Sequence, residues 1–131
     1  MILVDSSVWI DWFCDRKTDE VVRLDHLTGR QELGIADLVL VEVLQGTKDV
    51  REFERVRSIL LELPQVNVGG TEVAVEAARN FQRLRERGIT IRKTIDTLIA
   101  TRCIMDGHQL LFRDRDFGPF VSHLGLRSAL N

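Results

Sequence analysis

The chain has 131 residues, of which 44% are hydrophobic and 29% are charged, with a formal net charge of −2 at pH 7. This length predicts one compact domain, residues 1–131, and the charge balance excludes a general polycation mechanism for nucleic-acid or membrane binding. Two cysteines are too few for a disulfide framework, and no apolar stretch approaches the roughly 18 residues of a membrane span. We therefore expect a cytoplasmic protein.

The first apolar segment, residues 2–4, is too short for a helix and predicts a buried strand, which Asp5 ends. Ser6 and Ser7 can accept the first backbone N–H groups of a helix that follows. The same patterns predict three more strands, at residues 33–36, 66–68 and 109–112. Helical periodicity predicts further helices between them and a short irregular or helical tail after them; these helices lie at residues 19–27, 38–45, 49–63, 73–88 and 94–107.

Strands that alternate with helices favour parallel pairing through right-handed crossovers. The sequence therefore predicts an α/β fold of three layers, α/β/α, around a central parallel sheet of four to five short strands. In open sheets of this kind the ligand site lies beyond the carboxyl ends of the strands. We therefore expect the functional residues at that edge of the sheet.

Four acidic residues are expected to meet at this edge. Asp5 follows the first strand, Asp114 follows the last, Asp96 lies in the first turn of its helix, and Glu42 is embedded in a largely apolar and buried helix. Like charges at close range raise one another's pKa and cost stability, so a cation is expected to neutralise them. Oxygen ligands favour Mg²⁺ or Mn²⁺ over zinc, and such an ion can activate water against a phosphodiester.

Four segments around these residues resemble PIN-domain ribonucleases of the VapC toxin type, and they occur in that family's order over nearly the whole chain: residues 5–11, 41–46, 94–100 and 110–117. The resemblance implies an endoribonuclease that depends on Mg²⁺ or Mn²⁺, is silenced by a small cognate antitoxin and forms a homodimer as well as a toxin–antitoxin hetero-oligomer. It makes Asp5, Glu42, Asp96 and Asp114 the catalytic and metal-binding quartet, with Ser7 as a polar helper. Asp116 lies in the same segment as Asp114, and either residue could face the metal.

Each of these acids also has a structural interpretation. Asp5 could cap the helix after it, Asp96 could gain about 0.3 to 1 kcal/mol from the helix macrodipole, and Asp114 could form a surface ion pair with Arg113 or Arg115. Glu42 has no comparable alternative, because an unpaired carboxylate within an apolar helix costs several kcal/mol.

Basic residues near the acids are candidates for RNA binding. Arg92 and Lys93 precede the helix of Asp96, and Arg113 and Arg115 flank Asp114. The basic run from residue 79 to residue 93 also fits a solvated helix face with local ion pairs. Apolar residues of the first helices and of the helix at 49–63 could form a groove for an antitoxin helix.

Two other function classes compete with the nuclease. A phosphoacceptor signalling domain also gathers aspartates around Mg²⁺ at strand ends, but it needs an acidic pair near the amino terminus, where this sequence has Asp5 alone, and a lysine after its last strands, where this sequence has Arg113. The other class is a non-catalytic α/β binding module. Its nucleotide-binding form is disfavoured because neither glycine-rich phosphate-binding motif occurs.

Overall fold

The computed structural model describes residues 1–30 and 32–131. A parallel sheet of five strands lies at its centre, in the order β3-β2-β1-β4-β5. Its strands are β1 (Ile2–Val4), β2 (Leu33–Ala36), β3 (Gln65–Val66), β4 (Gln109–Leu111) and β5 (Arg127–Ser128).

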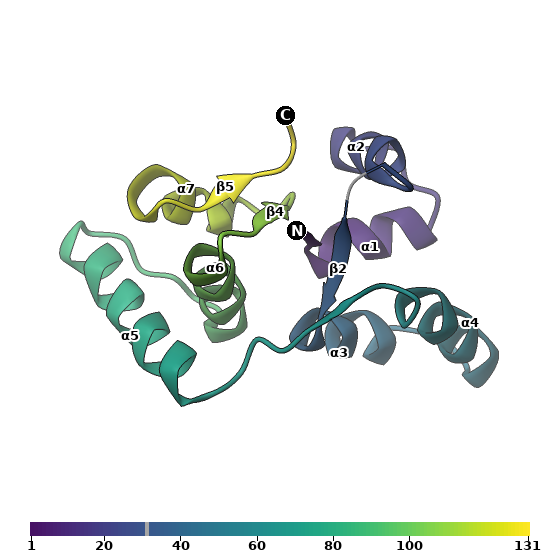
Figure 1. Cartoon of the computed structure of the whole chain (residues 1–131), viewed down its shortest axis with the longest axis horizontal. Helices are drawn as coiled ribbons and strands as arrows, with labels where there is room; N and C mark the ends of the chain where they lie inside the picture. The colour runs from purple at the N-terminus through teal and green to yellow at the C-terminus, as the bar shows by residue number, and fades with distance from the viewer. Residues whose placement is uncertain (31) are drawn as a thin grey trace.

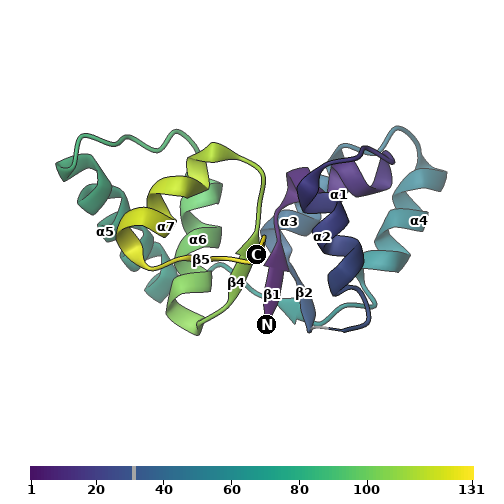
Figure 2. The same cartoon turned by 90° about the horizontal axis from the view of Figure 1, so that it is seen from above.

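Helices cover both faces of this sheet. In the two views of Figures 1 and 2, the first group of helices lies on one side of the strands and the second group on the other. The first group is α1 (Ser6–Phe13), α2 (Asp19–Leu27), α3 (Asp37–Gln45) and α4 (Val50–Leu60). The second is α5 (Thr71–Glu86), α6 (Thr94–Asp106) and α7 (Gly118–Leu124), preceded by a 3₁₀ turn, η1 (Arg115–Phe117). The three-layer α/β fold expected from the sequence is confirmed.

The strand order places a switch in direction at the middle of the sheet. The chain moves outward from β1 to β2 and β3 and then returns to β4 on the other side of β1. Val4 pairs with Leu111, and the backbone N–H of Asp5 donates to the carbonyl of Leu111 at 2.9 Å. The segments that follow β1 and β4 therefore leave the sheet side by side, at the position where open α/β sheets bind ligands.

The core lies on both faces of the central strands. All of β1 is buried, Leu110 and Leu111 have no exposed surface, and Phe117 and Phe120 are fully buried beside them. Each such side chain contributes about 1.5 to 3 kcal/mol by leaving water. This apolar centre holds the ends of β1 and β4 in fixed positions. No helix within the described ranges is both long and apolar enough to cross a bilayer.

The structure corrects several details. The third strand is residues 65–66 rather than 66–68, because the Val68 N–H donates to the Asp37 carboxylate instead of to a neighbouring strand. The fourth strand ends at Leu111, one residue early. A fifth strand was allowed for, but β5 was not located from the sequence, since two residues carry no readable periodicity. Helix α3 is not largely buried: Val39 and Val43 are buried, whereas Val41 is 57% exposed, because one face packs against α1 and β2.

Asp37 joins two parts of the chain. Its Oδ1 accepts the N–H of Leu38 at 2.8 Å and the N–H of Val68 at 3.0 Å, so the start of α3 is tied to the segment after β3. Val68 is completely buried. A buried donor without a partner is costly, which makes this contact a constraint on the fold.

We expect Asp37→Ala to lower the free energy of unfolding by about 1 to 3 kcal/mol, because the Val68 N–H would stay buried without an acceptor. Urea denaturation followed by circular dichroism measures the change. Asp49→Ala is the control, since Asp49 caps α4 through a single exposed hydrogen bond to the Glu52 N–H. A loss for Asp37→Ala no larger than that for Asp49→Ala would contradict the interpretation.

Candidate functional site

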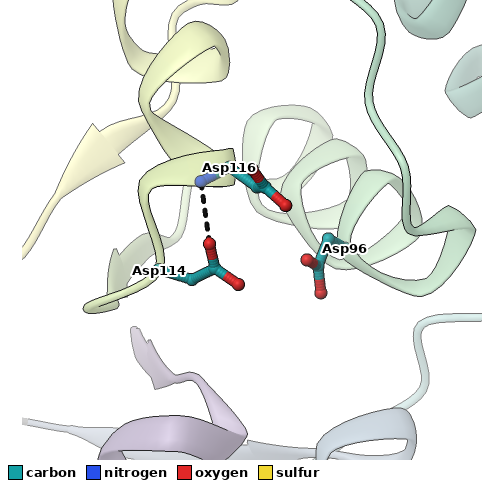
Figure 3. A group of neighbouring side chains, drawn as sticks. All are labelled: Asp96, Asp114 and Asp116. Atoms are coloured by element: carbon teal, nitrogen blue, oxygen red, sulfur yellow. Dashed lines mark hydrogen bonds between the residues drawn. The ribbon is translucent and has the colours of Figure 1, made fainter.

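Three aspartates converge at the carboxyl edge of the sheet (Figure 3). Asp96 lies in the first turn of α6, Asp114 follows β4, and Asp116 lies in η1; one carboxylate oxygen from each lies within 4.8 Å of the others. Asp114 and Asp116 are partly exposed, whereas Asp96 is 4% exposed. The structure therefore places both Asp114 and Asp116 beside Asp96, whereas the sequence left open which of the two would lie there.

Asp5 and Glu42 lie close enough to this group to act on it electrostatically. Asp5 is 4% exposed, and burial raises its pKa, with a smaller contribution from the charge of Asp114. Burial also raises the pKa of Glu42, followed by the charge of Asp5. All four acids expected from the sequence thus influence one another across two helical layers. The arrangement concentrates negative charge at one point of the surface.

Asp96 is the most strongly affected of these acids. Its pKa is raised from 3.8 to about 7, first by burial and then by the charge of Asp5. Lys93 opposes this rise, while Asp114 and Glu42 add to it. Near neutral pH this carboxyl therefore exchanges a proton with solvent unless another cation takes the proton's place.

Asp114 differs from its neighbours because it already has partners. Its Oδ1 accepts the Asp116 N–H at 2.9 Å, and its Oδ2 lies 3.3 Å from the Lys93 ammonium. The backbone hydrogen bond from Asp116 is the main reason why the pKa of Asp114 is lowered, and Lys93 contributes further. Asp114 is a stable anion at the edge of the cluster.

Local sequence explains how Asp5 is presented. Asp5 has an extended backbone, with φ −68° and ψ 155°, and α1 begins at the next residue. The Ser7 hydroxyl donates to Asp5 Oδ2 at 2.9 Å. That hydrogen bond fixes the carboxylate and partly offsets the effect of burial on its pKa. Ser7 therefore lies beside the acids, as expected.

The oxygen atoms of this cluster fit a hard divalent cation. Among the described residues, Asp96 Oδ2 and Glu42 Oε1 are buried and have no hydrogen-bond partner. Buried carboxylate oxygens are rarely left in this state, because each then lacks both water and a compensating charge. The donors are carboxylates, which suit Mg²⁺ or Mn²⁺ better than zinc.

The candidate RNA-binding residues form two groups, those in an ion pair with an acid and those that are exposed without one among the described residues. Lys93 is paired with Asp114, and Arg113 donates from Nε to the Asp11 carboxylate at 2.9 Å rather than to Asp114. Arg92 and Arg115 are exposed and form no ion pair within residues 1–30 and 32–131. The earlier part of the basic run is a solvated helix face, where Glu76 pairs with both Arg79 and Arg83.

The sequence pattern did not indicate Asp11 as a residue that contacts the segment carrying Asp114. It lies in α1 and is 2% exposed, with Arg16 and Arg113 as partners. Asp11 carries the same sequence signal as Glu42, since both are acids within apolar helical segments. Its partner Arg113 is 102 residues away, and no local pattern reveals that contact.

A groove of about 400 Å³ lies between α1, α2 and α4, and none of the five acids of the cluster lines it. Apolar rings and aliphatic side chains line part of it, namely Trp12, Phe13, Val21 and Ile59. The Trp12 indole N–H donates to Asp25 Oδ1 at 3.0 Å, and the Arg55 guanidinium lies 5.9 Å from the centroid of the Phe13 ring. The first helices and α4 therefore form a groove, as the sequence analysis expected.

We expect Asp96→Asn to stabilise the metal-free protein more at pH 8 than at pH 5. Asp96 has a folded pKa above its ordinary value, so folding favours its protonated form, and its contribution to stability falls as pH rises from about 4 to 7. The asparagine variant escapes this loss, with an upper limit of about 4 kcal/mol above pH 7. Urea unfolding in EDTA at both pH values measures the difference, and an equal gain at both would contradict the assignment.

Comparisons with known proteins agree with this architecture. The family model described as PIN domain matches residues 2–119. Ribonuclease VapC11 of Mycobacterium tuberculosis is 28% identical over 131 residues, covering 98% of both chains, and Ribonuclease VapC1 of Methanocaldococcus jannaschii is 28% identical over 126 residues, covering 96% of this chain and 85% of that one. The crystal structure of VapBC2 from Rickettsia felis, bound to a DNA fragment from their promoter, superposes with a TM-score of 0.74 at 18% identity over 98% of this chain and 97% of that one.

Proposed function

Because the chain belongs to the PIN domain family, we propose that it is a metal-dependent endoribonuclease and the toxin of a toxin–antitoxin pair. The single observation that carries the proposal is the cluster of Asp96, Asp114 and Asp116, with Asp5 and Glu42 close enough to raise the pKa of Asp96. Asp96 and Glu42 each add a buried oxygen without a hydrogen-bond partner among the described residues. The names of the relatives support it, since VapC11 and VapC1 are called ribonucleases. The family also favours this function over a phosphoacceptor domain or a non-catalytic binding module.

In this proposal Asp5, Glu42, Asp96 and Asp114 are the catalytic and metal-binding residues, and the ion is Mg²⁺ or Mn²⁺. Such an ion, when bound, polarises a phosphodiester and lowers the pKa of water. Ser7 holds the Asp5 carboxylate in place through its hydroxyl. Asp116 contributes a further oxygen and, through its backbone N–H, keeps Asp114 ionised.

The exposed cations beside the cluster are assigned to the RNA backbone. Lys93 places an ammonium group 3.3 Å from Asp114, at the edge of the acids, and its side chain is 59% exposed. Arg92 and Arg115 lie on the two segments that carry Asp96 and Asp114 and are exposed. Positive charge on both sides of the acids offsets their repulsion of phosphate. This local charge is needed because the chain as a whole has a net charge of −2.

We expect Asp5→Asn and Asp96→Asn each to reduce RNA cleavage by at least about 100-fold and to weaken Mn²⁺ binding, because each removes a charged oxygen ligand. Cleavage of a fluorescent RNA and titration calorimetry provide the two measurements. Glu62→Gln, on the exposed turn after α4, is the control with the same loss of charge. Wild-type cleavage rates in both aspartate variants would end the nuclease proposal.

The groove between α1, α2 and α4 is assigned to the antitoxin. It presents apolar side chains together with an exposed arginine and aspartate, which suits an amphipathic segment of a small protein. The Rickettsia felis structure is described as VapBC2, a complex found on a promoter fragment. By analogy we assign this chain an antitoxin partner, with homodimers forming part of the hetero-oligomer.

We expect Ile59→Glu to weaken the antitoxin complex at least about tenfold, because it buries a charge in the apolar part of the groove. The measurement is copurification with the product of the neighbouring small open reading frame, together with relief of growth arrest. Val121→Glu is the matched control: Val121 is 38% exposed on α7, and Ile59 is 36% exposed. Undiminished copurification of Ile59→Glu would place the antitoxin elsewhere.

A further inference from the structure

The carboxylate of Asp11, in α1, is buried and has a partner on each of its two oxygens. Its side chain is 3% exposed. Oδ1 accepts Arg16 Nη1 at 3.1 Å, and Oδ2 accepts Arg113 Nε at 2.9 Å. A buried carboxylate with both oxygens bound to guanidinium groups is held in one position, because the two charge-assisted hydrogen bonds fix the direction of each oxygen.

The two arginines connect Asp11 to different parts of the molecule. Arg16 is five residues further along the same segment, just after α1. Arg113 is 102 residues away and lies between β4 and Asp114. The Arg16 contact therefore closes a local turn, whereas the Arg113 contact joins the helix that starts beside Asp5 to the segment that carries Asp114.

Asp114 is otherwise fixed by contacts from its own side of the sheet. Its carboxylate is held by the Asp116 N–H and by Lys93, and the Phe112 and Phe117 rings pack with centroids 5.2 Å apart on either side of it in sequence. None of these contacts reaches α1. Among the described residues, two polar contacts join the segment around the end of β4 to Asp5 and α1: the Asp5 N–H donates to the Leu111 carbonyl, and Asp11 pairs with Arg113.

We propose that Arg113 is a positioning residue, which sets the distance between Asp114 and Asp5 for cation binding through its ion pair with Asp11. The inference rests on the proposed function. The sequence suggested a direct phosphate contact for Arg113, whereas the Nε of Arg113 donates to a buried carboxylate, and the test below distinguishes the two roles. Two metal ligands on different segments of the chain, here Asp5 and Asp114, keep their relative positions only when a contact joins those segments.

The test compares Arg113→Met with Arg16→Met in the full chain. Both variants remove one guanidinium from the same carboxylate, but one of these contacts leads to Asp114 and the other does not. Titration calorimetry of the metal-free proteins with Mn²⁺ is expected to show affinity about tenfold weaker for Arg113→Met and within about twofold of wild type for Arg16→Met. Circular dichroism verifies that each protein is folded.

Two further variants keep the test decisive if Arg113→Met does not fold. Arg113→Lys retains the charge and is expected to recover part of the Mn²⁺ affinity. Asp11→Asn keeps the shape of the acceptor and is expected to lose as much affinity as Arg113→Met, with no further loss when the two are combined.

The outcomes separate this inference from the proposed function. Absence of Mn²⁺ uptake by the wild-type chain would overturn the proposed function and the inference with it. Wild-type uptake that is unchanged in Arg113→Met overturns the inference alone, and weakened RNA binding in that variant would then assign Arg113 to phosphate. An equal loss in Arg16→Met would also overturn it, because the loss would then follow from Asp11 and not from the link to Asp114.

Discussion

Repulsion among carboxylates at one edge of the sheet is the constraint on which the rest of the structure depends. Asp5 and Asp96 are each 4% exposed, and burial together with the charges of their neighbours raises the pKa of both. A fold can tolerate such a cluster when apolar burial elsewhere offsets its cost. Here the buried β1 strand and the fully buried Leu110 and Leu111 of β4 provide that burial directly behind the acids.

The acids near this edge fall into two groups with different roles. Asp11 and Asp114 have their oxygens occupied by arginine, lysine or a backbone N–H. Asp96 and Glu42 each keep a buried oxygen without a partner within the described part of the chain. The hydrogen bonds and ion pairs of the first group hold its carboxylates in place, and Asp114 remains one of the proposed metal ligands. The unpartnered oxygens of the second group leave further binding capacity for a cation. This division explains why the pKa of Asp114 is lowered while that of Asp96 is raised.

Sequence periodicity predicted the layers and most element positions, because buried strands and amphipathic helices impose regular spacing. It also predicted which acids would be neighbours, since residues after parallel strands share an edge. It did not predict β5, which is two residues long, or the exposure of Val41, which depends on how α3 packs. The pair of Asp11 with Arg113 joins residues 102 positions apart, so it follows from the completed fold and not from any local pattern.

The site lies between the two helical layers of the molecule and takes residues from both. Asp5 and Glu42 come with the helices of one layer, while Asp96, Asp114 and Asp116 come with those of the other (Figure 1). Strands β1 and β4 are the neighbours that meet between these layers. In the proposed metal site, the two sets of oxygens would have to meet the near-ideal octahedral geometry that Mg²⁺ requires, so a small displacement of one layer against the other would weaken binding. Contacts that join the two layers would therefore influence the proposed chemistry without touching the substrate.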